Sequence, residues 1–208
     1  MNKLENSLNI IEEINISFYK SLLSMTPLFG TVLNEIFFDC RARVKQNRLN
    51  NFIETLDNRL KEIKIQTEDI KDNEDFIDAF ELVLKKVIDT KAQYKINIFR
   101  DILINQLDTD KQIDTGLLDR FLDIIYQMSE IEIKILNDIK QLAENKSQTK
   151  NNFNLSDEKY NFYIQNLISK SLLYDSGMNR LGARPFDVVK LTILGKELLD
   201  YILTNNDK

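Results

Sequence analysis

The chain contains no histidine among its 208 residues. Histidine is the usual general base near neutral pH and a common zinc ligand, so its absence removes Ser–His and Cys–His nucleophilic pairs and imidazole-ligated zinc sites. The Glu-x-x-His pattern of di-iron helical bundles is absent for the same reason. We therefore expect no enzyme, no catalytic, cofactor-binding or metal-binding residue and no small-molecule substrate, although carboxylate-only Mg²⁺ or Ca²⁺ sites remain open.

Cysteine is almost absent as well, because Cys40 is the single thiol. One thiol cannot form an intramolecular disulfide, so nothing points to an oxidising compartment. Cys40 lies close to Phe37 and Phe38 in a helical stretch, which is typical of a packed, unreactive side chain. Residues 1–9 are mostly polar and lack the apolar core of a signal peptide, so the sequence predicts a cytoplasmic protein.

Basic residues are fewer than acidic ones: the chain has 28 Lys and Arg and 33 Asp and Glu, which gives a net charge of −5. Binding to nucleic acid or anionic membrane needs a basic surface, so the composition disfavours both as general properties and leaves a local basic patch open. A long apolar run is missing too. The uncharged stretch 21–34 has 14 residues, whereas roughly 20 are needed to span a bilayer.

Glycine and proline are scarce, with five and two residues, so the sequence predicts long uninterrupted helices. Apolar residues recur every three or four positions and indicate these elements. The predicted helices lie near 3–24 and 27–65, after Asn73, after Thr90, from Leu117, and from Ser129 to about Ala143. Polar breaks separate them at 67–73, 108–116 and 144–154, and the last of these reads as a mobile linker.

The side chains at the predicted helix starts suit the unsatisfied N–H groups there. Asn73 and Ser156 are N-cap candidates, and each is followed by two acids that the helix dipole favours. Ser129 and Glu132 form the Ser-x-x-Glu capping box. In the helix after Thr90 we expect four residues to face inward: Tyr94, Ile98, Ile102 and Leu103.

The C-terminal part changes character. The helix after Ser156 leads into a short extended segment, a glycine-containing turn region, a β-branched strand candidate at 186–191 and a last helix capped by Thr192. This order resembles the second half of a winged-helix domain of the MarR-like kind. There a Leu-Thr-x-x-Gly-x-x-Leu-Leu segment begins the closing helix, which here reads Leu191, Thr192, Gly195, Leu198 and Leu199. The resemblance covers roughly residues 128–205 and implies a two-stranded wing, although one expected helix before Ser156 is missing.

A wider resemblance is to bacterial abortive-infection proteins of the Abi-alpha type. It rests on the N-terminal helical region, on a Glu-Ile-x-Ile-Leu helix at 132–136, on the winged-helix-like end, and on Phe99, Asp101, Ile102 and Leu103. It implies a role in anti-phage defence, with a partner protein or membrane association, and it carries over no catalytic residue. The first 70 residues do not match the pattern.

Four basic residues of the C-terminal module are candidates for contact with nucleic acid or a partner: Lys159, Arg180, Arg184 and Lys190. Residues 155–202 nevertheless hold six acids and six bases, and the acids Asp157 and Glu158 would face phosphate at the helix start. We therefore expect the module to dock on another protein or on a second copy of this chain. DNA binding is the alternative.

The densest basic cluster contains Arg41, Lys45 and Arg48, which share one side of a helix at spacings of three and four. It follows the apolar segment 27–38. One interpretation is an amphipathic segment with a basic collar that binds a membrane surface or nucleic acid. The favoured interpretation is a helix that leaves the core and carries its charges into solvent.

Together these patterns predict a mainly α protein. We expect an N-terminal helical bundle at 1–127 and a C-terminal winged-helix-like module with a short β-hairpin at 128–208. The predicted function is that of a non-enzymatic interaction or regulatory protein of the bacterial cytoplasm, in anti-phage defence. A DNA-binding regulator and a membrane-perturbing effector that uses 27–38 are the alternatives.

Overall fold

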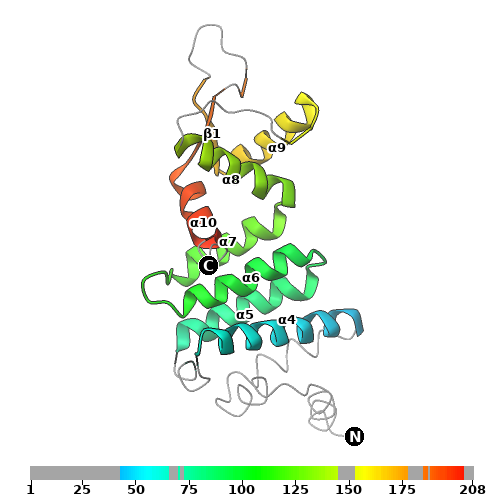
Figure 1. The fold of residues 1–208 in the computed structure, drawn as a ribbon, viewed down its shortest axis with the longest axis vertical. Helices are drawn as coiled ribbons and strands as arrows, with labels where there is room; N and C mark the ends of the chain where they lie inside the picture. The colour runs from blue at the N-terminus through cyan, green and yellow to red at the C-terminus, as the bar shows by residue number, and fades with distance from the viewer. Residues whose placement is uncertain are drawn as a thin grey trace, which may run out of the picture. The chain divides into compact units, whose positions relative to one another are not determined.

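The structure is a computed structural model that describes residues 43–65, 70, 73–144, 153–177, 185–186 and 188–203. In these ranges the chain forms seven helices and one two-stranded sheet (Figure 1). The predicted helix at 3–24, the apolar segment 27–38 and nearly all of the linker 144–154 lie outside the described residues. The chain divides into two compact units, Met1–Tyr126 and Gln127–Lys208.

The first unit is built from helices that pack on one another. The described helices are α4 (Arg43–Glu62), α5 (Glu74–Asp89), α6 (Gln93–Gln106) and α7 (Thr115–Gln127). Helix α5 packs against α4 and α6, and α4 also contacts α6 (Figure 1). Their apolar faces meet around large, fully buried side chains: Phe52, Phe76, Phe80, Phe99 and Phe121. Helix α4 contributes one apolar face to this core, since Phe52, Ile53, Leu56 and Leu60 are all buried.

Two helix starts in this unit, those of α5 and α7, follow local side-chain chemistry. Asn73 caps α5 as predicted, since its Oδ1 accepts a hydrogen bond from the N–H of Phe76 at 2.9 Å. The prediction that the next polar break reaches Gly116 is wrong, because α7 begins at Thr115. Its start is set by Asp114, whose Oδ1 accepts a hydrogen bond from Leu117 N at 3.0 Å.

The predicted inward face of α6 is partly wrong. Ile102 and Leu103 are buried as expected, but Tyr94 and Ile98 are only half-buried, and Ile96 and Phe99 are buried instead. From residue 101 to 106 every side chain of α6 is buried, so this end of the helix has no solvent face. Three of the buried side chains are polar: Asp101, Asn105 and Gln106.

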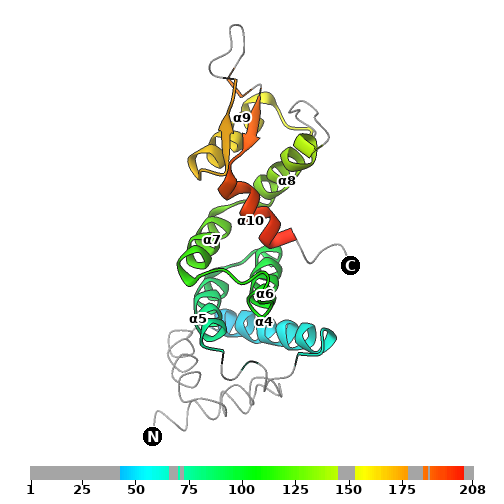
Figure 2. The same ribbon diagram turned by 90° about the vertical axis from the view of Figure 1, so that its left-hand side faces the viewer.

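The second unit combines three helices with the hairpin. Its elements are α8 (Glu130–Glu144), α9 (Asp157–Ser169), β1 (Leu173–Asp175), β2 (Val189–Leu191) and α10 (Ile193–Leu203). The strands are antiparallel, with the pairs Leu173–Leu191, Tyr174–Lys190 and Asp175–Val189. Helix α8 packs against α9, α10 and β2, and α9 packs against β1 (Figure 2).

Sequence expectations for the ends of these helices are confirmed. The N–H of Ser129 donates to Glu132 Oε2 at 2.7 Å, as a capping box requires. Ser156 caps α9, and Thr192 caps α10 through a 2.9 Å bond from Gly195 N to its hydroxyl. The strand predicted at 186–191 is shorter than expected and begins at Val189, because Phe186 adopts a positive φ of 68° that no regular strand permits.

Helix α9 ends in a hydrogen-bonded C-terminal turn at Ser171, which has a positive φ of 60°. The N–H of Leu172 donates to the carbonyl of Leu167, and the N–H of Ser171 donates to that of Ile168. These two bonds form a Schellman motif, with the buried side chains of Leu167 and Leu172 beside it. The turn therefore delivers the chain directly into β1.

Membrane-spanning geometry is not found in the described ranges, because none of their helices is long and apolar enough to cross a bilayer.

Candidate interaction surface

The structure places two of the four candidate contact residues of the second unit. Lys159 lies in the first turn of α9 and Lys190 lies in the middle of β2, and both are exposed. Arg180 and Arg184 lie outside the described residues. Lys159 and Lys190 come from different elements, and Lys159 follows directly on the exposed acids Asp157 and Glu158. These two lysines alone do not make a surface of one charge.

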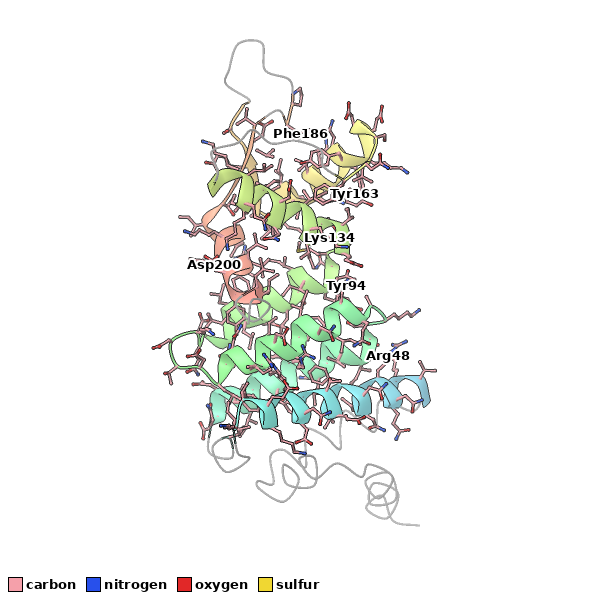
Figure 3. The ribbon with its side chains drawn as sticks, in the orientation of Figure 1. Arg48, Tyr94, Lys134, Tyr163, Phe186 and Asp200 are labelled. Carbon is pink, nitrogen blue, oxygen red and sulfur yellow. The ribbon has the colours of Figure 1, made fainter. Side chains whose placement is uncertain are left out.

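The basic cluster at the start of α4 binds within its own unit. Lys45 Nζ lies 2.6 Å from Asp89 Oδ1, and Arg48 Nη1 donates to the carbonyl of Ile88 at 3.1 Å. Both contacts reach the C-terminal end of α5, where unpaired carbonyls and the helix dipole attract cations. Arg48 is labelled on α4 in Figure 3. Arg41 lies outside the described residues. The described part of the collar therefore joins α4 to α5.

Helix α9 turns one full stripe of side chains to solvent. Its members recur at intervals of four, three and four residues, and all four are exposed: Glu158, Phe162, Gln165 and Ser169. The opposite face packs in the core through Tyr160, Ile164 and Leu167. We call these four exposed residues the outer stripe of α9.

Phe162 is the conspicuous member of the outer stripe. It is 56% exposed, which is costly for an aromatic side chain in water. Its ring meets that of Tyr163 edge-on, with 5.5 Å between the centroids, in an arrangement that aromatic pairs prefer. Tyr163, labelled on α9 in Figure 3, is itself half-buried, so it limits the conformations that Phe162 can adopt.

The N-terminal end of the outer stripe carries negative charge. The pKa of Glu158 lies below its ordinary value, first because its carboxylate accepts a hydrogen bond from its own backbone N–H and second because it interacts with the Ser156 side chain. Glu158 is therefore ionised at neutral pH. Hydrogen bonding at the start of a helix stabilises this charge in the absence of any partner.

The hairpin adds a second exposed aromatic residue. Tyr174 is 46% exposed and pairs across the strands with Lys190, so their side chains share the solvent face of the hairpin. The neighbouring positions Leu173 and Val189 are buried. The hairpin therefore follows the alternation of a half-buried sheet.

Three aromatic residues lie close together in the sequence of α9, namely Tyr160, Phe162 and Tyr163, and such a spacing suits either stacking on bases or packing in the core. The structure separates them, because Tyr160 is buried and Phe162 is exposed. The signal was present in the spacing. Tyr160, Ile164 and Leu167 follow a helical stripe at intervals of four and three residues, and Phe162 lies off it.

Comparison with known proteins assigns no relatives, since no family model, no curated protein and no solved structure matches the chain significantly.

Proposed function

We propose that this protein is a non-enzymatic interaction protein whose C-terminal unit, a winged-helix-like module, docks on another protein molecule through the outer stripe of α9. The order α8, α9, β1, β2 and α10 supports the comparison with a winged helix, in which the helix before the wing is the usual contact element. The observation that carries the proposal is the exposed ring of Phe162 beside the ionised Glu158.

The physical case is one of area and charge. Burying an aromatic side chain against a partner removes a large apolar surface from water, and aromatic residues are enriched among those that dominate binding energy. Phe162 already has a neighbouring ring that orders it, so fixing its rotamer on binding costs less entropy. Glu158, one helical turn away, favours a partner that presents a Lys or Arg next to an apolar hollow.

DNA binding is the second candidate, and Lys159 and Lys190 are the described residues that favour it. Asp157 and Glu158 oppose it, because they lie in the first turn of α9, where a recognition helix would approach phosphate. Contact with a polyanion would also place the negative charge of Glu158 beside phosphate, which is unfavourable. The α9 surface therefore supports a protein partner better than a nucleic acid.

A role in bacterial anti-phage defence is part of the proposal and rests on the resemblance to Abi-alpha-type proteins alone. The membrane-perturbing alternative depends on residues 27–38. Liposome leakage that is lost in Phe29→Asp or Leu33→Asp, without loss of folding, would support that alternative.

The test is site-specific cross-linking. A photo-reactive phenylalanine analogue is placed at position 162, and a matched probe replaces Ile193, which is 79% exposed on α10. We expect a cross-linked protein product, either a chain dimer or a complex with a second protein, at position 162 and not at 193. Adding Glu158→Lys should weaken that product.

A DNA-binding measurement distinguishes the protein-docking proposal from the DNA-binding one. Fluorescence anisotropy with duplex DNA at low salt should show no salt-sensitive binding. Tight binding that weakens with salt and is lost in Lys159→Glu or Lys190→Glu would replace the protein-docking proposal with the DNA-binding one. Equal cross-linking at 162 and 193 would also contradict it.

A further inference from the structure

The connection between β1 and β2 needs anchoring beyond the strands themselves. Each strand has three residues, and the connection runs from residue 176 to 188. The packing of β1 on α9 and of β2 on α8 stabilises the strands. A long connection nevertheless adds to the entropy lost when its ends are brought together. Contacts at the base of the connection offset part of that cost.

Asp175 supplies those contacts. Its Oδ1 accepts a hydrogen bond from Gly177 N at 2.8 Å, and its Oδ2 accepts one from Phe186 N at 2.9 Å. One carboxylate thus spans the two sides of the connection. Beside it, the backbone N–H and the hydroxyl of Ser176 both donate to the carbonyl of Val188, at 2.8 and 3.0 Å. One backbone hydrogen bond and the side chains of Asp175 and Ser176 therefore continue the pairing of the two strands beyond the β ladder.

Phe186 is held in a conformation that its side chain disfavours. Its φ of 68° lies in the left-handed region, where glycine is at ease and a bulky residue is strained. Such strain persists only where surrounding contacts impose it. Its backbone N–H donates to Asp175 Oδ2, which is a charge-assisted hydrogen bond and therefore one of the stronger kind. Figure 3 labels Phe186 at the hairpin connection.

We infer that Asp175 is a latch: its two carboxylate oxygens hold the base of the β1–β2 connection together, with Gly177 on one side and Phe186, in the left-handed region, on the other. Without the latch, Phe186 relaxes to a negative φ and the two sides of the connection separate. This inference goes beyond the docking proposal and does not depend on it. It concerns how the hairpin is held in the free protein, whichever partner the module takes.

The experiment measures amide hydrogen exchange and backbone chemical shifts by NMR on the full chain. In Asp175→Asn, which keeps the shape, removes the charge and replaces one of the two acceptor oxygens by an NH2 group, we expect the amides of Gly177 and Phe186 to exchange at least tenfold faster. The shifts of Phe186 should move toward those of an extended residue. The amide of Thr192, which is bonded to the carbonyl of Leu172, should keep its protection.

A second variant keeps the test decisive. Phe186→Gly removes the strain while leaving the carboxylate in place, so both latch amides should exchange several-fold more slowly than in the wild type. Asp200→Asn is the matched control, since Asp200 pairs with Lys140 on the surface of the same unit and should change neither amide. Unchanged exchange at Gly177 and Phe186 in Asp175→Asn, or an equal rise at Thr192, would overturn the latch.

Discussion

Gly195 lies so close to Leu172 that a Cβ built at position 195 would come 2.2 Å from the Leu172 carbonyl oxygen. The same oxygen accepts a hydrogen bond from Thr192 N at 3.0 Å, and the Thr192 hydroxyl donates to the Ser171 carbonyl at 2.6 Å. The first turn of α10 is thus packed directly on the backbone between α9 and β1. The Thr-x-x-Gly spacing has a physical reason here, since threonine makes the bonds and glycine permits the approach.

Replacing Gly195 should lower the free energy of unfolding. In Gly195→Ala the new methyl group meets backbone, which cannot rotate away as a side chain can, so α10 must shift. We expect a loss of about 2 kcal/mol or more in the free energy of unfolding, measured by urea denaturation. Gly116→Ala is the matched control, because its Cβ would meet only the Asp114 carboxylate, at 3.1 Å. Alanine is the better helix former, so that variant should stay within about 1 kcal/mol of the wild type. Equal stability of both variants would show that α10 is not packed on Leu172.

The capping box of α8 gives a second prediction. Glu132 is buried, accepts hydrogen bonds from both the N–H and the hydroxyl of Ser129, and lies 3.5 Å from Lys170 Nζ on the turn after α9. Glu132→Ala leaves the N–H of Ser129 without its acceptor and the nearly buried ammonium of Lys170 without its carboxylate. We expect a loss of about 2 kcal/mol.

Glu130 is the control for this pair, because it forms an ion pair with Lys134 in the same first turn but both side chains are exposed. Exposed pairs contribute little, so Glu130→Ala should cost at most about 0.5 kcal/mol by thermal or urea unfolding. Similar losses in the two variants would mean that the buried contacts of Glu132 add no more stability than an exposed ion pair.

Features that depend on neighbours in sequence were predictable from the sequence. The side chains of Asn73, Ser129 and Ser156 each accept a hydrogen bond from the N–H three residues on, so local spacing is enough to find these caps. Features that join distant positions were not. Arg48 meets the carbonyl of Ile88, 40 residues on, and no local pattern shows that a basic residue will complete another helix. The Arg48 contact therefore appeared in the sequence only as a charge cluster.

The left-handed backbone conformations could not be predicted from the sequence, for a different reason. Left-handed residues are expected at glycine, yet this chain uses Ser171 and Phe186 there, which composition does not signal. The even burial of α6 beyond residue 100 also hides its face, because a helix surrounded on all sides shows no clear apolar stripe. Tyr94 and Ile98 lie before that point, on a predicted stripe that includes Ile102, whereas the buried side chains there are Ile96 and Phe99.

At the end of α4, two substitutions of the same residue should change the free energy of unfolding in opposite directions. Lys64 has a φ of 60°, and the bonds from Lys64 N to the Lys61 carbonyl and from Ile65 N to the Leu60 carbonyl close a Schellman turn. Glycine adopts this φ without strain, so Lys64→Gly should raise the free energy of unfolding by about 1 kcal/mol. Lys64→Val should lower it, because a branched Cβ is worst at positive φ. A stabilising valine or a destabilising glycine in urea unfolding would contradict the left-handed turn.

The hydroxyl of Tyr160 gives a pH-dependent prediction. Among the described residues it is buried without a hydrogen-bond partner, and burial, followed by the charge of Asp138, raises the pKa of Tyr160 to about 12. In the unfolded chain a tyrosine ionises near pH 10. Between about pH 10 and 12 the unfolded state therefore holds fewer protons than the native state, and stability falls as pH rises. Tyr160→Phe removes both the unpaired hydroxyl and this linkage. It should be as stable as the wild type or about 1 kcal/mol more stable at neutral pH, and its advantage should grow through the alkaline window.

Urea unfolding at a series of alkaline pH values measures this difference, with Tyr174→Phe as the control at an exposed tyrosine. Ultraviolet titration of the native protein should show one phenol that ionises only at about pH 12 and disappears in Tyr160→Phe. Asp138→Asn should bring that ionisation to lower pH, because it removes the second cause of the shift. If Tyr160→Phe is clearly less stable than the wild type at neutral pH, the hydroxyl has a hydrogen-bond partner and its burial is not a cost.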